Sequence, residues 1–72
     1  MTAKAKRKRN TAYSTHEYTI TKMDPTGTVI EANRVIGSRD AFHTQTDAEG
    51  YGFLVVVHNV TTDTEEYRSE GL

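Results

Sequence analysis

The chain has 72 residues, no cysteine and a formal net charge of −1 at pH 7. This length allows one domain, and the absence of cysteine excludes disulfides and thiolate metal sites. No apolar run approaches the roughly 20 residues of a transmembrane helix, and no apolar segment follows the basic start as in a secretory signal. We therefore expect a cytoplasmic location (nuclear in a eukaryote) and no membrane partner.

The charge is divided unevenly along the chain. Residues 10–72 hold four basic residues against all ten acidic ones, which gives them a formal charge of −6. Residues 1–10 contain no large apolar side chain beyond Met1, so burial cannot offset the entropy cost of ordering them. The pattern predicts a flexible, disordered basic arm over 1–10 and a single small β domain over 11–72. The arm holds five of the nine basic residues: Lys4, Lys6, Arg7, Lys8 and Arg9.

The first predicted elements after the arm are two strands joined by a turn. Tyr18 and Ile20 alternate with Thr19 and Thr21, which is a strand pattern and predicts a strand over 16–23. The Asp-Pro-Thr-Gly sequence at 24–27 has the residues that a type I turn with a following left-handed glycine prefers. It predicts a hairpin to a second strand over 28–36. That second stretch also fits one face of a helix, so a helix within 28–46 remains the alternative.

The second half of the chain predicts further short strands separated by turns. The clearest strand is 51–60, which contains three consecutive valines. The expected order is a short strand at 41–46, a turn at 47–50, the strand at 51–60, a turn at 61–64 and an edge strand at 65–68.

The predicted fold is therefore all-β. We expect a small antiparallel meander of about five strands that forms a barrel or a curved sheet. An α+β fold with a helix within 28–46 is the alternative. The apolar run from Phe53 to Val57 does not alternate with polar residues, so both faces of its strand need cover. Its second face is a candidate interface, and the predicted partner-interface residues are Tyr51, Phe53, Leu54 and Val56.

The sequence from Gly50 to Leu54 resembles the Gly-aromatic-Gly-aromatic stretch of cold-shock domains, in which exposed rings stack on single-stranded bases. Glu49 stands where that family has a lysine, and the tryptophan expected after the family's opening strand is missing. The likeness covers only fragments of the chain. We interpret it as convergent turn and strand chemistry, and we expect Tyr51 and Phe53 to be core or rim residues.

Catalysis and metal binding have little support in the sequence. His16, His43 and His58 show no recognised ligand spacing, and the chain has no nucleophile elbow or phosphate loop. A chain this short can rarely enclose a substrate pocket. We expect no enzyme activity, no cofactor, no metal and no small-molecule substrate.

Two functions remain. The first is a small accessory or regulatory protein that binds DNA or RNA, its arm contacting phosphates and its fold contributing Lys22, Arg34 and Arg39. The second is a protein-interaction module, such as a small inhibitor or adaptor of viral or plasmid type. It would bind a host protein, or a second copy of itself, through a sheet edge or the apolar face.

Overall fold

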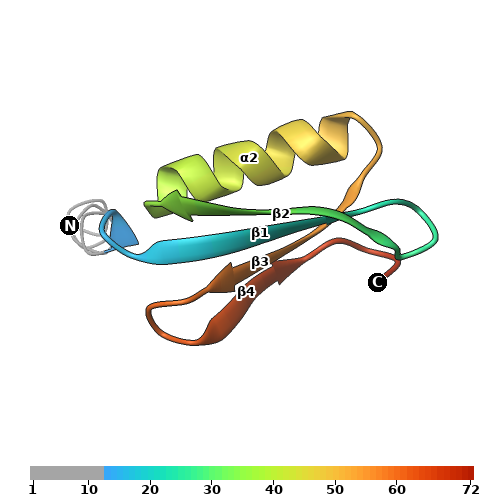
Figure 1. Cartoon of the computed structure of the whole chain (residues 1–72). Helices are drawn as coiled ribbons and strands as arrows, with labels where there is room; N and C mark the ends of the chain where they lie inside the picture. The colour runs from blue at the N-terminus through green and yellow to red at the C-terminus, as the bar shows by residue number, and fades with distance from the viewer. Residues whose placement is uncertain (1–12) are drawn as a thin grey trace, which may run out of the picture.

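The computed structural model describes residues 13–72, so the predicted arm over 1–10 lies outside the described part of the chain. These residues form a four-stranded antiparallel sheet with strand order β2-β1-β3-β4 and one helix, α2. Figure 1 shows α2 lying along one side of the sheet. The elements are β1 (Glu17–Met23), β2 (Val29–Ile36), α2 (Ser38–Gly50), β3 (Leu54–Asn59) and β4 (Thr64–Arg68).

Most of the described residues in regular secondary structure lie in strands, as predicted, but their sheet does not close into a barrel. The strand predicted at 41–46 and the turn predicted at 47–50 are wrong, because both segments belong to α2. Ala41 and Ala48 are buried seven residues apart, two helical turns along the same face. The spacing of these two small residues, rather than any apolar run, places the helix against the sheet. The strand predicted from 51 begins only at Leu54.

The first hairpin is confirmed. Gly27 has a φ of 89°, which glycine adopts without strain, and its N–H donates to the carbonyl of Asp24 at 2.8 Å. The Asp24 carboxylate also accepts from the backbone N–H of Thr26 at 2.9 Å and of Thr28 at 3.0 Å. The turn delivers the chain into β2, which pairs with β1 through a register shift beside Met23.

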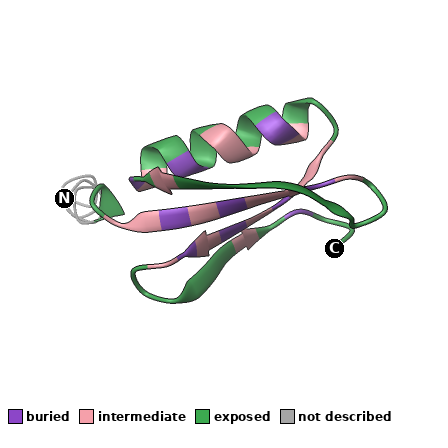
Figure 2. Cartoon of the chain, in the orientation of Figure 1, coloured by how far each residue is buried: buried purple, intermediate pink, exposed green. Residues whose placement is uncertain are grey.

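The core lies between α2 and the central strands of the sheet (Figure 2). Burial of these side chains supplies most of the favourable free energy of folding in a domain of this size. The partly buried Val35, Phe53 and Tyr67 surround the core. Its buried members are Tyr18, Ile20, Ala41, Ala48, Val55 and Val57.

The strand register assigns every side chain of the sheet to one of two faces. Directly opposite residues on neighbouring strands share a face, and successive residues alternate. Ile20 lies opposite Val57, and both face α2. Thr21 lies opposite Val56, so these two side chains belong to the other face. We call the side of the sheet away from α2 the open face, because no other element within residues 13–72 covers it.

Candidate protein-interaction surface

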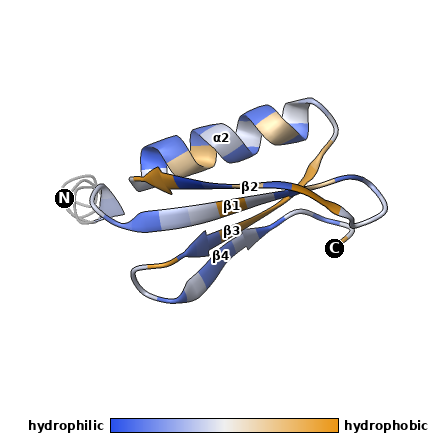
Figure 3. Cartoon of the chain, viewed as in Figure 1, coloured by the Kyte–Doolittle hydropathy of each residue, from blue (hydrophilic) through white to orange (hydrophobic). Residues whose placement is uncertain are grey.

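The open face has an apolar end. Met23 lies opposite Val29 of β2 on one side and Leu54 of β3 on the other. The next row across the sheet contains Ala32 and Val56 on either side of Thr21. Figure 3 shows hydrophobic residues along β3 and at both ends of β2. We call the apolar members of these two rows the apolar patch: Met23, Val29, Ala32, Leu54 and Val56.

The apolar patch is exposed unevenly. Met23 in its centre is 8% exposed, whereas Val29 at the sheet edge is 59% exposed. Leu54 and Val56 are half-buried although no helix covers them. The patch therefore meets solvent mainly at Val29 and Ala32 and in part at Leu54 and Val56, whereas Met23 is shielded. A contiguous apolar surface of this kind marks interaction sites in soluble proteins.

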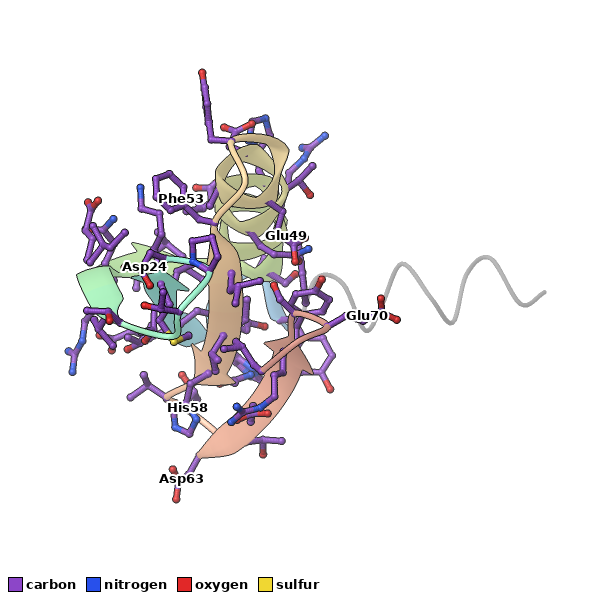
Figure 4. All side chains as sticks on the ribbon, turned by 90° about the vertical axis from the view of Figure 1, so that its right-hand side faces the viewer. Asp24, Glu49, Phe53, His58, Asp63 and Glu70 are labelled. Carbon is purple, nitrogen blue, oxygen red and sulfur yellow. The ribbon has the colours of Figure 1, made fainter. Side chains whose placement is uncertain are left out.

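The other end of the open face is polar. The row after the patch runs from Arg34 through Thr19 and His58 to Glu65. Arg34 forms an ion pair with Glu17 at 2.6 Å, and the His58 ring nitrogen lies 3.1 Å from an Asp63 oxygen (Figure 4). The open face thus has an apolar half and a charged half, as expected of an interface with a dry core and a polar rim.

Most positive charge in the described part of the chain is already paired. Lys22 pairs with Glu31 at 3.2 Å and also lies 4.9 Å from the centre of the Phe53 ring. Arg68 binds Glu65 through two hydrogen bonds, which lower the pKa of that carboxyl. Of the four basic residues within 13–72, only Arg39 has no ion pair. The body therefore presents its carboxylates more freely than its cations.

The nucleic-acid residues predicted on the body do not share a surface. Lys22 lies on the face that α2 covers, Arg34 lies on the open face, and Arg39 lies in the first turn of α2. The five predicted residues of the arm fall outside the described part of the chain. Among residues 13–72, the predicted basic residues thus form no common patch.

The four predicted interface residues divide into two pairs. Leu54 and Val56 lie in adjacent rows of the open face and belong to the apolar patch. Tyr51 is 84% exposed just after the end of α2, and Phe53 packs partly against the core. The Gly-aromatic stretch is therefore a helix end and a turn, unlike the base-stacking strand of the family that it resembles. The sequence did not single out Val29 or Met23, because only strand pairing places them beside Leu54.

A network of polar side chains surrounds Glu49 near the end of α2 (Figure 4). Its carboxylate accepts hydrogen bonds from Gln45 at 2.8 Å, from Tyr67 at 2.5 Å and from Ser69. Ser69 is 5% exposed and also accepts from the Val55 N–H at 2.9 Å. Burial raises the pKa of Glu49, but these donors outweigh it and leave the pKa below its usual range.

This network adjoins an open hollow of about 590 Å³ that includes Phe53 and Glu70 in its lining. The Ser69 hydroxyl is nearly inaccessible, and both hydroxyls that reach Glu49 are held in intramolecular hydrogen bonds. The arrangement ties the end of α2 to the end of β4. It is a structural joint, and we assign it no chemistry.

The three histidines lie in separate surroundings. His16 is hydrogen-bonded to Asn59 at 3.0 Å, and His43 lies 3.4 Å from Asp47 on α2. Among residues 13–72, no group of three or more histidine, aspartate or glutamate side chains could hold a metal ion. No helix in that range is long and apolar enough to cross a membrane.

Comparison with known proteins gives no relative. The chain matches no protein-family model, no curated protein and no solved structure.

Proposed function

We propose that this chain is a non-enzymatic protein-interaction module that binds a basic partner protein through the apolar patch on its open face. The observation that carries the proposal is the composition of β3, which is apolar on both sides. Val55 and Val57 are covered by α2, whereas Leu54 and Val56 face outward. Because residues 13–72 provide one helix to cover the sheet, a strand that is apolar on both sides leaves one side for another molecule.

The charge of the body supports a basic partner. Residues 13–72 contain ten acidic and four basic residues, and three of those basic side chains are held in ion pairs. Asp63 is largely exposed at the polar end of the open face, where the Glu17 and Glu65 carboxylates pair with Arg34 and Arg68. The excess of acidic residues in residues 13–72 accelerates encounter with a cationic surface and disfavours an acidic one, while the apolar patch provides the dry contact.

Site-specific photocrosslinking in the native host cell tests this proposal. A photoreactive amino acid at Val56 should yield a discrete adduct with a partner, because that position lies in the patch. The same group at Thr46, which is exposed on α2, should yield none. Adding Leu54→Asp to the Val56 probe should reduce the adduct at least about tenfold, since a charge within the patch must be desolvated on binding.

Two results would contradict the proposal. One is equal adduct formation from both probe positions. The other is an undiminished adduct after Leu54→Asp in a protein whose circular dichroism and melting temperature match the parent. If irradiation of a cell lysate at high salt gave an unchanged yield of adduct, that result would argue against the basic partner, because screening weakens charge attraction.

A second candidate function is nucleic-acid binding by residues 4–9. The segregation of positive charge onto this segment favours it, since five cations within six residues match the spacing of consecutive phosphates. Each neutralised phosphate releases counterions, so such binding has little sequence preference and depends steeply on salt. This candidate is compatible with the first, because the two use different parts of the chain.

Fluorescence anisotropy with a labelled DNA duplex tests the second candidate. Full-length protein should show a slope of log affinity against log salt of about −3.6 to −4.5, as expected for roughly four or five phosphate contacts. Changing all five arm cations to glutamine should abolish binding, whereas Arg39→Gln should change affinity less than about twofold. The absence of any binding to duplex or single strand at low salt would refute this function.

A further inference from the structure

β2 forms one edge of the sheet, and its outer side is unpaired within residues 13–72. Seven of its eight residues are exposed. Val29, Ile30 and Ile36 are 59%, 52% and 60% exposed, an unusual state for aliphatic side chains in a strand. An edge of this kind presents free backbone N–H and C=O groups to any extended chain.

β2 lacks most of the usual protections of an edge strand, although the register shift beside Met23 places one irregularity near its start. It contains neither proline nor lysine, and its only charged residues are Glu31 and Arg34. Glu31 pairs with Lys22, and Arg34 pairs with Glu17. Both partners lie on β1, on the side away from the free edge, so neither charge guards the edge itself.

The opposite edge is protected. β4 contains two adjacent glutamates, Glu65 and Glu66, and Asp63 and Glu70 flank it. A second copy of β4 laid against it would bring these carboxylates together, which costs free energy. The net charge of β2 is zero, so a second β2 can approach it without repulsion.

We propose that β2 pairs antiparallel with β2 of a second copy of this chain and joins the two sheets into one of eight strands. Both helices then lie on the same side of the joined sheet, and the two apolar patches become neighbours. The proposal goes beyond the protein-interaction function and does not depend on it, because it concerns the edge rather than the open face.

The side-chain pattern selects a register for this pairing. A twofold axis perpendicular to the sheet must pass through a pair of identical residues if each face is to meet the same face. An axis at Glu31 or at Arg34 would oppose like charges. An axis at Asn33 opposes two amides at the centre and sets Ile30 against Ile36 of the second copy at both ends. Two exposed aliphatic pairs are then buried, which makes this the favoured register.

Light scattering after size-exclusion chromatography tests the pairing, over concentrations from about 5 to 500 μM. The wild-type chain of 8.1 kDa should approach twice that mass as concentration rises. Ile30→Lys with Ile36→Lys opposes lysines at both ends and should raise the dissociation constant at least tenfold. Ile30→Lys with Ile36→Glu opposes unlike charges in the same register and should restore dimerisation to within about threefold of wild type.

The control variant carries His43→Lys and Thr46→Lys on the exposed side of α2 and should dimerise like the wild type. Hydrogen exchange gives a readout that needs no mutation, since the outward amides of β2 should become protected as concentration rises and those of β4 should not.

A wild-type chain that stays monomeric at every concentration would overturn the inference. The inference would also fail if the Lys/Lys variant dimerised as well as the wild type. It would fail likewise if the Lys/Glu variant folded but did not associate. None of these results changes the expected photocrosslink from Val56, so the photocrosslinking experiment tests the proposed function independently.

Discussion

Glu49 organises a hydrogen-bond network that no sequence pattern predicts. It lies near the end of α2, where the helix dipole disfavours a carboxylate. Three donors from α2, β4 and the segment after β4 nevertheless hold it ionised. Hydrogen bonding to Glu49 is also the main reason that the pKa of Tyr67 is raised. The carboxylate thus connects parts of the chain twenty residues apart.

Glu49 should therefore contribute to acid sensitivity. Its folded pKa lies below its usual value, so its stabilisation is present above the unfolded pKa, near 4.3, and is lost as pH falls through the folded pKa. Glu49→Gln should lower the free energy of unfolding by about 1–2 kcal/mol at pH 7 and by little at pH 2.5.

Urea denaturation at pH 7, 5 and 2.5 measures this difference. Glu70→Gln, an exposed carboxylate in the same hollow, is the matched control and should change stability by less than about 0.5 kcal/mol. A Glu49→Gln deficit that stays constant across the pH range would show that the ionised carboxylate is not what stabilises this joint.

At the scale of elements, the conformation of the turn between β1 and β2 is explained by hydrogen bonds among residues close together in the sequence. Asp24 accepts three hydrogen bonds from Thr26 and Thr28, led by the Thr26 hydroxyl, and its pKa is lowered accordingly. Asp24→Ala should lower the melting temperature by roughly 4–10 °C, because the turn loses its side-chain acceptor. Differential scanning calorimetry measures this shift.

Asp63→Asn is the control for the turn. Asp63 lies in the next hairpin with a φ of 56°, a conformation that asparagine adopts as readily. That variant should shift the melting temperature by less than about 3 °C. If Asp24→Ala were equally mild, the first turn would owe its form to Pro25 and Gly27 rather than to the aspartate.

The helix is the element that local patterns locate least well, because the sequence allows a helix within 28–46 only as the alternative, whereas α2 spans Ser38–Gly50. The segment before it ends in Gly37, whose φ of 95° turns the chain from β2 toward α2. A side chain there would approach the Ser14 carbonyl to 3.1 Å. Gly37 directly follows Ile36, the last residue of β2. Gly37 also allows the chain to pass close to the backbone of Ser14, and this role depends on a contact with a distant part of the chain.

At the scale of the whole molecule, the fold separates its surfaces by kind. α2 covers one face of the sheet, the apolar patch and a polar row share the other, and the two edges differ in charge. The β2 edge is neutral and apolar, and the β4 edge is acidic. A dimer through β2 would leave the open face of each copy accessible, so self-association and partner binding can coexist on one molecule.

The sequence by itself determined the first hairpin, the strand character of residues 16–23 and 28–36, and the two-sided apolar nature of β3. Each of these depends on neighbours within a few residues: turn chemistry at 24–27, or consecutive valines that no single wet face can accommodate. It also determined the division of charge, which is a matter of composition.

Only the tertiary structure decided that residues 38–50 form a helix and which side of β3 remains open. The helix packs on the sheet through Ala41 and Ala48. Two small apolar residues give only a weak helical pattern in the sequence, and their contribution to packing depends on the sheet that buries them. The patch likewise joins Val29, Met23 and Leu54 from three strands. Because strand order and register arise from long-range pairing, no local pattern could have placed these three side chains in one row.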